Sequence, residues 1–380
     1  MHKVGIPTVV LERSDALREE GAAIGMWTNA FRALDAIGVA EPCRAAHPLN
    51  TRIRILRDSG AKLREFGMDE CHGGPHEIRP VFRSGLLKAL EGGVHSERMH
   101  FGVKVADARS TADGATVTLD DGRELRSRAV IGADGVRSVV GRSLNIPAPT
   151  YSGYIAYRGV ARFDDGLPVP EQTISMVFGA GGRRAGMIPL DDRHVYWFTT
   201  ANRPASDPPL RDPAACKADA LQLVRDWHWG VASVIQQTDE AGISRACIMD
   251  RWMAPGRSVG EGALSLVGDA LHPCTPNLGQ GGCLALEDAV VLAQALRGVQ
   301  GGGAGGTLRS ATATAVAEAL RGYERERSVR ALRIAAQSWL FGFVLQMPFA
   351  PVVAARDFYV KNLLMPQHFL SHTLFDVGSL

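Results

Sequence analysis

The stretch that decides the fold runs from Gly268 to Asp288 and reads GDALHPCTPNLGQGGCLALED. The five residues before it, Ala263–Val267, are mostly apolar and are typical of a short buried strand. An acidic turn at Gly268-Asp269 follows, then a bend rich in proline and glycine, and a helix is predicted to begin near Cys283. Because the first turn of that helix is nearly free of side chains, its N–H groups are open to a flat polar ligand. The helix dipole favours negative charge there.

This segment resembles the second flavin-contacting motif of class A flavin-dependent monooxygenases. That family includes salicylate hydroxylase-like enzymes and zeaxanthin epoxidase, and the likeness is greatest to its plant-type branch. The family pattern is GD, two or three residues, HP, and then P-x-x-G-x-G-x-x-x-A-x-x-D. Two further segments resemble family motifs in the same order along the chain. Val9–Arg13 is similar to the strand whose terminal acid holds the adenosine ribose, and Ala129–Ser138 contains an Asp-Gly pair like that of the family's DG motif.

The resemblance implies an α/β fold in which a Rossmann-like FAD-binding domain of the glutathione reductase type accompanies a mixed-sheet substrate domain and C-terminal helices. The expected FAD-binding domain is discontinuous and comprises residues 1–50, 76–149 and 259–300. The expected substrate domain comprises residues 51–75 and 150–258, and the C-terminal helical region comprises residues 307–380.

Family members open with a strand and a G-x-G-x-x-G loop, and neither precedes Gly5, which is predicted to end the first helix. On the order of 25 residues would be missing, judged from the ~30-residue βαβ unit. We expect Thr8–Leu11 to lack a neighbouring strand on one side. Either the protein begins further upstream, or it is a shortened chain with impaired cofactor binding.

The amino-acid composition argues against several classes of function. The chain has 380 residues, of which 46% are hydrophobic, so it can bury a core of two packed domains. A formal net charge of +2 gives no reason to expect a nucleic-acid partner. Six scattered cysteines without a C-x-x-C pair argue against a zinc site or disulfides and favour a reducing intracellular compartment such as the cytoplasm or a plastid. The start, Met1–Gly5, is unlike a signal peptide.

The resemblance also assigns roles around the quoted stretch. Asp269 would hold a ribityl hydroxyl of FAD, since hydrogen bonds to an ionised acceptor are strong. The N–H groups of Leu278, Gly279, Gln280 and Gly281 would face flavin N1 and O2, where negative charge gathers on reduction. The alternative for Asp269 is a cap of its own turn.

Six other residues receive cofactor-binding roles by the same resemblance. Glu12, with Arg13 beside it, would hold the adenosine ribose, and Val105 would lie near the adenine. Arg83 would reach the phosphate or ribityl region, to which a guanidinium group is suited. Asp134 and Gly135 would lie beside the cofactor and the nicotinamide. The alternatives are a solvated arginine at a helix start for Arg83 and a purely structural role for Asp134.

The remaining segments give a coarse secondary structure. Predicted helices span residues 28–39, 84–90, 214–227, 284–296 and 311–336. Predicted strands span residues 52–57, 115–119, 124–131, 154–163, 173–178, 184–189 and 194–200. Gly298–Gly306 reads as a low-complexity loop. Trp339–Ala355 is apolar but broken by Gln346 and two prolines, so we expect a packed helix pair. The alternative that stays open is that this region associates weakly with a membrane surface, which would give the protein access to an oily substrate.

The chemistry expected from the residues is that of a cofactor enzyme. The sequence suggests no Ser/His/Asp triad, metal cluster or paired carboxylates, and His272 is interpreted as structural. The resemblance implies that NADPH or NADH reduces FAD, that O2 adds at flavin C4a, and that the hydroperoxide passes one oxygen atom to an aromatic or isoprenoid-like small molecule. The alternatives are a cofactor-poor paralogue acting through protein contacts and a flavin reductase or halogenase. The Trp227-His228-Trp229 run lacks the Ile-Pro of halogenases and is interpreted as packing.

Overall fold

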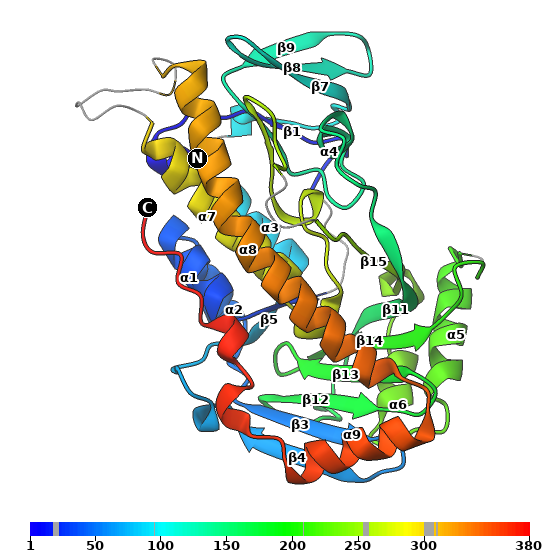
Figure 1. The fold of residues 1–380 in the computed structure, drawn as a ribbon. Helices are drawn as coiled ribbons and strands as arrows, with labels where there is room; N and C mark the ends of the chain where they lie inside the picture. The colour runs from blue at the N-terminus through cyan, green and yellow to red at the C-terminus, as the bar shows by residue number, and fades with distance from the viewer. Residues whose placement is uncertain (18–22, 95, 208, 254–257, 300–307, 309–310) are drawn as a thin grey trace.

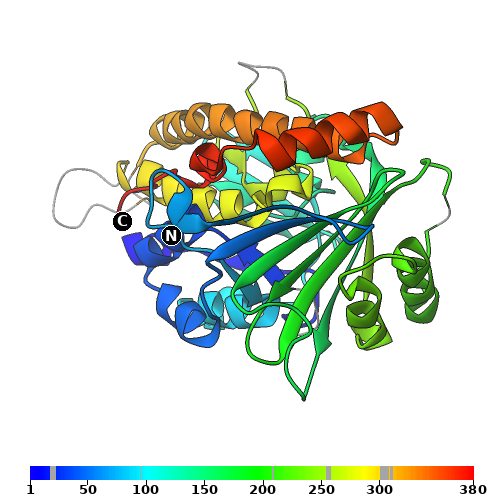
Figure 2. The same cartoon turned by 90° about the horizontal axis from the view of Figure 1, so that it is seen from below.

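The computed structural model describes residues 1–17, 23–94, 96–207, 209–253, 258–299, 308 and 311–380. A large sheet lies at one end of the molecule, and smaller sheets with their helices lie at the other (Figure 1). The long helix α8 (Ala313–Gln346) runs beside both parts. Seen from below, α8 and α9 (Ala350–Asn362) lie along one side of the large sheet, while α5 and α6 lie away from them (Figure 2).

The large sheet has seven strands in the order β15-β11-β14-β13-β12-β3-β4. Their bounds are β3 Arg52–Arg57, β4 Lys62–Gly67, β11 Thr150–Arg162, β12 Thr173–Phe178, β13 Arg183–Pro189, β14 His194–Asn202 and β15 Ser244–Asp250. Neighbours are antiparallel except β3 and β12, which are parallel. Segments near residues 52–67 and 150–250 therefore share one sheet.

Two helices cover one face of this sheet. They are α5 (Pro213–Val224) and α6 (Val231–Gln236), and their apolar side chains form a buried cluster with β11, β13 and β14. Trp227 and Trp229 pack against the same cluster, which confirms that the Trp-His-Trp run serves packing. The other face of the sheet is turned toward the rest of the molecule, where the candidate site lies.

Four small sheets make up the other end. β1 (Val10–Leu11) pairs with β6 (Met99–His100) and β10 (Val130–Gly132) pairs with β16 (Leu264–Leu266), both in parallel. β2 (Ala23–Met26) pairs with β5 (Arg79–Phe82), and β7 (Val105–Thr111), β8 (Gly114–Leu119) and β9 (Glu124–Ser127) form a meander. Within the described residues, β1 has β6 as its sole partner strand, as expected for Thr8–Leu11.

One predicted strand is wrong in extent. Residues 124–131 were expected to be continuous, but β9 ends at Ser127 and β10 begins at Val130. The break has a topological reason, because β9 pairs with β8 whereas β10 turns away to pair with β16. A local pattern of apolar residues does not show that a strand changes partner.

The remaining helices are α1 (Thr28–Ile37), α2 (Ala40–Ala46), α3 (Arg83–Glu91), α4 (Val139–Ser143) and α7 (Gly281–Arg297). Short 3-10 turns span residues 2–4, 68–70, 96–98, 240–242, 268–270, 276–278, 366–368 and 371–373. The helix α1 ends at Gly38, whose φ of 76° is a left-handed conformation that favours glycine. The predicted end of α8 near residue 336 is wrong, because no proline occurs before Pro348 and the helix continues to Gln346.

Most of the loop predicted at residues 298–306 lies outside the described residues. The predicted C-terminal helix pair is confirmed as α8 and α9. Among the described helices none is by itself long and apolar enough to cross a membrane, whereas α8 and α9 together, bent by 117°, meet that test of length and composition.

Candidate active site

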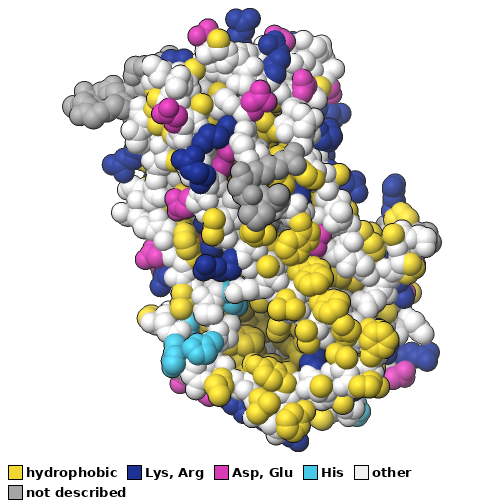
Figure 3. All heavy atoms as spheres, viewed as in Figure 1, with side chains coloured by type: hydrophobic (Ala, Val, Ile, Leu, Met, Phe, Trp, Pro, Cys, Tyr) yellow, Lys and Arg dark blue, Asp and Glu magenta, His cyan; other side chains and the backbone are white. Residues whose placement is uncertain are grey.

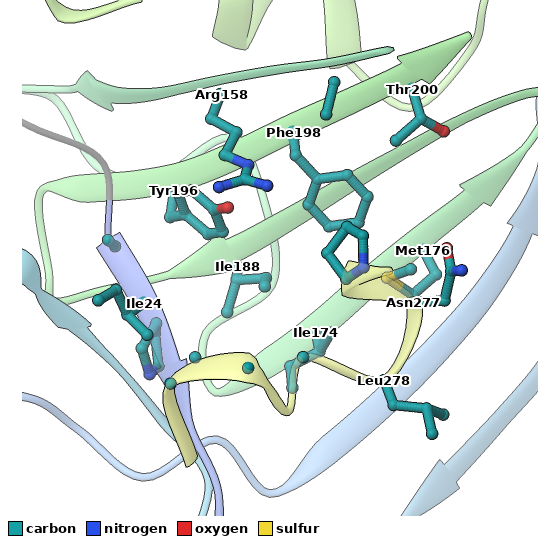
Figure 4. Close-up of a pocket in the computed structure, with 18 of the residues that line it drawn as sticks. Ile24, Arg158, Ile174, Met176, Ile188, Tyr196, Phe198, Thr200, Asn277 and Leu278 are labelled. Carbon is teal, nitrogen blue, oxygen red and sulfur yellow. The ribbon is translucent and has the colours of Figure 1, made fainter. Parts of the chain in front are cut away.

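A cavity of about 1240 Å³ lies between the small sheets and the open face of the large sheet. One wall comes from β2 and the start of α3, and a second from the connection between β16 and α7. The third is the large sheet itself, with Phe341 of α8 and Phe369 and His372 of the C-terminal segment at the border. Figure 4 shows Ile24 on one side of this space and Asn277 and Leu278 on the other.

The connection between β16 and α7 is the stretch that the sequence singled out. Gly268 begins a 3-10 turn, η5 (Gly268–Ala270), with a φ of 56°, a conformation that favours glycine. A second turn, η6 (Pro276–Leu278), ends at Gly279, whose φ is 62°. The helix α7 begins at Gly281, two residues before the predicted start at Cys283. The strand, acidic turn and helix therefore follow in the predicted order.

Asp269 points into the cavity. Its side chain lines the space and is open to it. Enclosure by protein raises the pKa of its carboxyl group, and the nearby charges of His272, Arg158 and Arg251 oppose that rise. An acid in this position can accept hydrogen bonds from a ligand hydroxyl, which fits the expected ribityl contact.

Gly279 faces the indole of Trp27. A Cβ atom added at Gly279 would lie 2.8 Å from Trp27 Nε1, so the indole leaves no room for a side chain at this position. The N–H group of Gly279 donates to the carbonyl of Pro276 at 3.0 Å. This N–H closes the turn in the structure, and its expected part in binding flavin N1 and O2 stays a prediction. Gly279 still lines the cavity, together with Leu278 and Gly281.

Gln280 differs from its neighbours because it does not line the cavity. Its side chain is buried, and Asn29 Nδ2 on α1 donates to its Oε1 at 2.8 Å. The same Asn29 amide donates to Glu287 on α7 at 2.6 Å. The Gln280 side chain thus anchors the connection to α1.

Arg83 and Arg158 face the cavity from opposite walls. Arg83 is the first residue of α3 and lines the space, as expected for a residue that reaches the cofactor. Arg158 lies on β11 and extends over the cavity beside Tyr196 (Figure 4). Both guanidinium groups add positive charge to a space that Asp269 alone would make acidic.

The large sheet gives the cavity an apolar wall. Alternate residues of a strand face the same side, so each strand sends a row of side chains inward. These inward residues are Ile53, Ile55, Ile174, Met176, Phe178, Ile188, Tyr196 and Phe198. Figure 4 shows several of them arranged across the sheet opposite the glycine-rich connection.

The three residues predicted for the adenosine end of the cofactor lie apart from the cavity. Glu12 follows β1, and its carboxylate accepts a hydrogen bond from the Ser14 N–H at 2.8 Å. Arg13 beside it is exposed. Val105 begins β7 and packs against the same apolar cluster as Leu11, the residue before Glu12. Glu12 and Val105 are thus brought to one region, as an adenosine site would require.

Asp134 and Gly135 form the turn between β10 and α4 and do not line the cavity. The Asp134 carboxylate accepts hydrogen bonds from the Ser138 hydroxyl and from the Val139 N–H, the latter at 2.6 Å. Gly135 has a φ of 77°, which this tight turn requires. The structural role left open for Asp134 is therefore present, and its cofactor contact stays a prediction.

Known protein families include one whose sequence pattern this chain matches. Residues 1–338 match the family model described as "FAD binding domain". The chain belongs to this FAD-binding family. Its relatives are FAD-dependent monooxygenases, and the chain is an enzyme of that kind.

Two relatives and one solved structure illustrate the match. The chain is 36% identical to the aurachin C monooxygenase/isomerase of Stigmatella aurantiaca over 78% of this chain and 76% of that protein. It is 30% identical to monooxygenase 2 of Arabidopsis thaliana over 100% of this chain and 94% of that protein. The fold resembles that of Klebsiella pneumoniae HpxO complexed with FAD and uric acid, with a TM-score of 0.84, 24% identity, and coverage of 98% and 91%.

The residues around the connection fit the flavin of this FAD-dependent enzyme. Trp27 lines the cavity, and its Nε1 atom is buried and has no partner among the described residues. A Cβ atom added at Gly281 would meet only Asp269 Oδ1, at 3.9 Å, so the first residue of α7 leaves room for a ring. That helix also has no side-chain cap from the described residues. A flat ring with a polar edge would find donors and space here.

A buried ionic cluster joins α7, α8 and the connection between β16 and α7. Arg327 of α8 donates to Glu287 and Asp288 of α7, each at 2.6 Å. Asp288 also accepts from the Gly268 N–H at 2.8 Å and from His272 Nε2 at 2.6 Å. Burial alone would raise the pKa of Asp288, but His272 and Arg327 lower it to about 2. The interpretation of His272 as structural is confirmed.

Some cavity residues were missed from the sequence. Trp27, Asn277 and the buried Arg184 were not singled out, and neither was the apolar row on the large sheet. Their signal in the sequence is weak, because each is distinguished only by contacts with residues far away in the sequence, such as the 93 positions between Arg184 and Asn277.

Proposed function

We propose that this FAD-dependent monooxygenase inserts one oxygen atom from O2 into an apolar, aromatic or isoprenoid-like small molecule, with NADPH or NADH as reductant. The observation that carries the substrate class is the apolar wall of the large sheet, which faces the glycine-rich connection across the cavity. Such a wall binds a hydrocarbon body by removing its surface from water.

One side of the cavity would bind the flavin, and the opposite side would position the substrate. Asp269, Trp27 Nε1 and the start of α7 would bind and orient the flavin, and Arg83 would neutralise its phosphate or hold its ribityl chain. When bound, FAD supplies the redox chemistry that activates O2. The isoleucine and phenylalanine side chains exclude water from the reacting region and position the substrate.

The experiment measures flavin content first and oxygen transfer second. The purified protein with added FAD should show flavin absorbance bands. Turnover with 18O2 and reduced nicotinamide should then give a product that carries one labelled oxygen. A folded but colourless protein would favour the cofactor-poor paralogue. Nicotinamide oxidation that yields hydrogen peroxide without labelled product from any apolar candidate would favour a reductase.

We also propose that the protein associates weakly with a membrane surface through its C-terminal region. Residues 334–355 contain no charged side chain. Exposed apolar residues gather on α8, α9 and the segment after them, namely Trp339, Leu340, Phe343, Val344, Phe349, Phe358, Tyr359, Leu363 and Met365. Figure 3 shows hydrophobic side chains of this face around a hollow. Aromatic residues of this kind are typical of membrane interfaces.

Vesicle sedimentation tests this association. Wild-type protein should co-sediment with phosphatidylcholine vesicles, and replacement of Phe343 and Phe358 by serine should reduce the bound fraction. Val329, an exposed apolar residue nearer the start of α8, provides the matched control as Val329→Ser. Equal binding by all three proteins, or none by the wild type, would refute the proposal.

A further inference from the structure

Two aromatic side chains form the border of the cavity on the side of α8 and the C-terminal segment. They are Phe341 of α8 and Phe369, and both line the cavity. Both also pack against a buried cluster that contains Ile53, Ile174 and Phe178, which belong to the cavity wall on β3 and β12. The apolar wall of the large sheet therefore continues into α8 and into the C-terminal segment.

On α8 the border of the cavity passes directly into an exposed apolar surface. Phe341 and Val344 are three residues apart, so their side chains are neighbours on the helix. Phe341 lines the cavity, whereas Val344 is 40% exposed. Leu340 and Phe343 extend the exposed surface, and Phe343 stacks on Trp339 with ring centroids 5.2 Å apart. One side of this helix thus faces the cavity, and the adjoining side is apolar and exposed.

The C-terminal segment makes the same transition from the cavity to the surface. Phe369 contacts Phe66 of β4, with ring centroids 5.1 Å apart. Leu364 packs against the same buried cluster, whereas Leu363 and Met365 on either side of it are exposed. Figure 3, in the orientation of Figure 1, shows a hollow with an apolar rim between α8, α9 and the C-terminal segment. The hollow therefore lies where the cavity border meets the apolar surface.

The charge around this hollow decides what kind of molecule it fits. Residues 334–355, which include the exposed part of α8 and the start of α9, contain no charged side chain. A polar chain would lose its hydration there without gaining a partner, whereas a hydrocarbon chain gains free energy with the area removed from water. A large exposed apolar patch marks a binding site. Its continuity with the cavity favours a ligand that occupies both.

We propose that the hollow is a groove for the hydrocarbon tail of the substrate, which passes between Phe341 and Phe369 while the part of the molecule that reacts lies deeper in the cavity. The substrate class is thus a ring or alkene that carries a long alkyl or isoprenoid tail. The far end of the tail lies against Phe343 and Val344, on the face that would meet a lipid surface. Calling the ligand a substrate rests on the proposed function, whereas the binding of a tail does not.

A homologous series of ligands tests the groove. Resorcinol, hexylresorcinol and dodecylresorcinol share one ring and differ only in the length of the alkyl tail. In FAD-loaded protein without vesicles, affinity should rise at each step, by about a hundredfold or more from resorcinol to hexylresorcinol, because each buried methylene group adds to the gain. A closed cavity would instead reject the longest homologue. Weaker binding of dodecylresorcinol than of hexylresorcinol in titration calorimetry would overturn the proposal.

A matched pair of variants locates the tail. Val344→Asp places a charge beside Phe341 at an exposed position, so the fold should tolerate it. It should weaken dodecylresorcinol binding at least about tenfold and leave resorcinol binding unchanged. Val329→Asp makes the same change about 22 Å away toward the start of α8 and should affect neither ligand. An equal loss in both variants, or no loss in Val344→Asp, would contradict the groove.

Tryptophan fluorescence gives an independent readout. Dodecylresorcinol with a bromine atom at the end of its tail should quench the fluorescence of Trp339, which stacks on Phe343. Trp339→Phe should remove most of this quenching, and quenching that is unchanged in the variant would place the tail elsewhere. A wild-type dimer that binds no tail, and that Val344→Asp converts to a monomer, would assign this face to a second copy of the chain instead.

Flavin content and labelled product, measured on the same preparations, separate the two proposals. A yellow, oxygen-transferring enzyme whose affinity does not rise with tail length would refute the groove alone. A colourless protein that keeps the preference for long tails would refute the oxygenase function alone.

Discussion

Replacing Asp288 by asparagine should loosen the connection that carries Asp269. The two carboxylate oxygens of Asp288 receive three donors, from the Gly268 N–H, His272 Nε2 and Arg327 Nε. An asparagine of the same shape has one oxygen and one NH2 group, so at least one donor would face another donor. Arg327 would also lose one of its two buried counter-charges.

The expected loss of unfolding free energy is about 3–5 kcal/mol, the cost of breaking a buried ion pair. The lowered pKa of Asp288 gives a second, separate magnitude for its contribution to stability. A pKa lowered from 3.8 to about 2 corresponds to about 2 kcal/mol of stability. Because the folded pKa lies below the ordinary one, this contribution is complete above pH 3.8 and is lost as the pH falls toward 2.

Urea unfolding of wild-type and Asp288→Asn protein at a series of pH values tests the reasoning. The difference in stability should be largest near neutral pH and should shrink below about pH 4. Asp164→Asn, which removes one partner of the exposed pair with Arg162, should change little. The Asp288 variant should also bind FAD more weakly. A loss below about 1 kcal/mol, or a difference that does not change with pH, would refute this account of the cluster.

Three further changes probe the flavin side of the cavity. Asp269→Ala should reduce the ratio of flavin to protein absorbance with little change in apoprotein Tm, because the side chain faces open space, and unchanged retention would contradict its role. Since the pKa of Asp269 is raised, wild-type FAD affinity should fall as the pH is lowered through that pKa, and titration of the variant should show no such fall. Gly279→Ala should cost about 1 kcal/mol or more of stability from its positive φ alone, which denaturant melts would reveal. Trp27→Phe should leave the apoprotein melting temperature nearly unchanged, because the indole N–H has no partner in the described part of the chain, but it should weaken FAD binding in a fluorescence titration.

The sequence predicted the features that depend on neighbouring residues. The turn at Gly268-Asp269 and the helix start at Arg83 follow from local backbone preferences, and the structure has both. The order of the motifs then identified the family, which the comparisons confirm.

What could not be predicted depends on distant contacts. Arg184 is an ordinary strand residue in the sequence, and it becomes unusual only because no acid from the described parts of the chain reaches it. The hydrogen bond from the Val139 N–H to the Asp134 carboxylate was likewise not predicted, and the cofactor contact of Asp134 stays a prediction. The split of residues 124–131 between two sheets likewise depends on the position of β16.

The length of α8 has a mechanical consequence. This one helix contacts β16 and α7 on the flavin side, η6 at the cavity, and β13 on the opposite wall. A rod attached to both walls sets the distance between them, so the two walls cannot spread apart without breaking the rod or its attachments. The width of the chamber is thereby built into the scaffold, and the thickness of a molecule decides whether it can occupy the space between them.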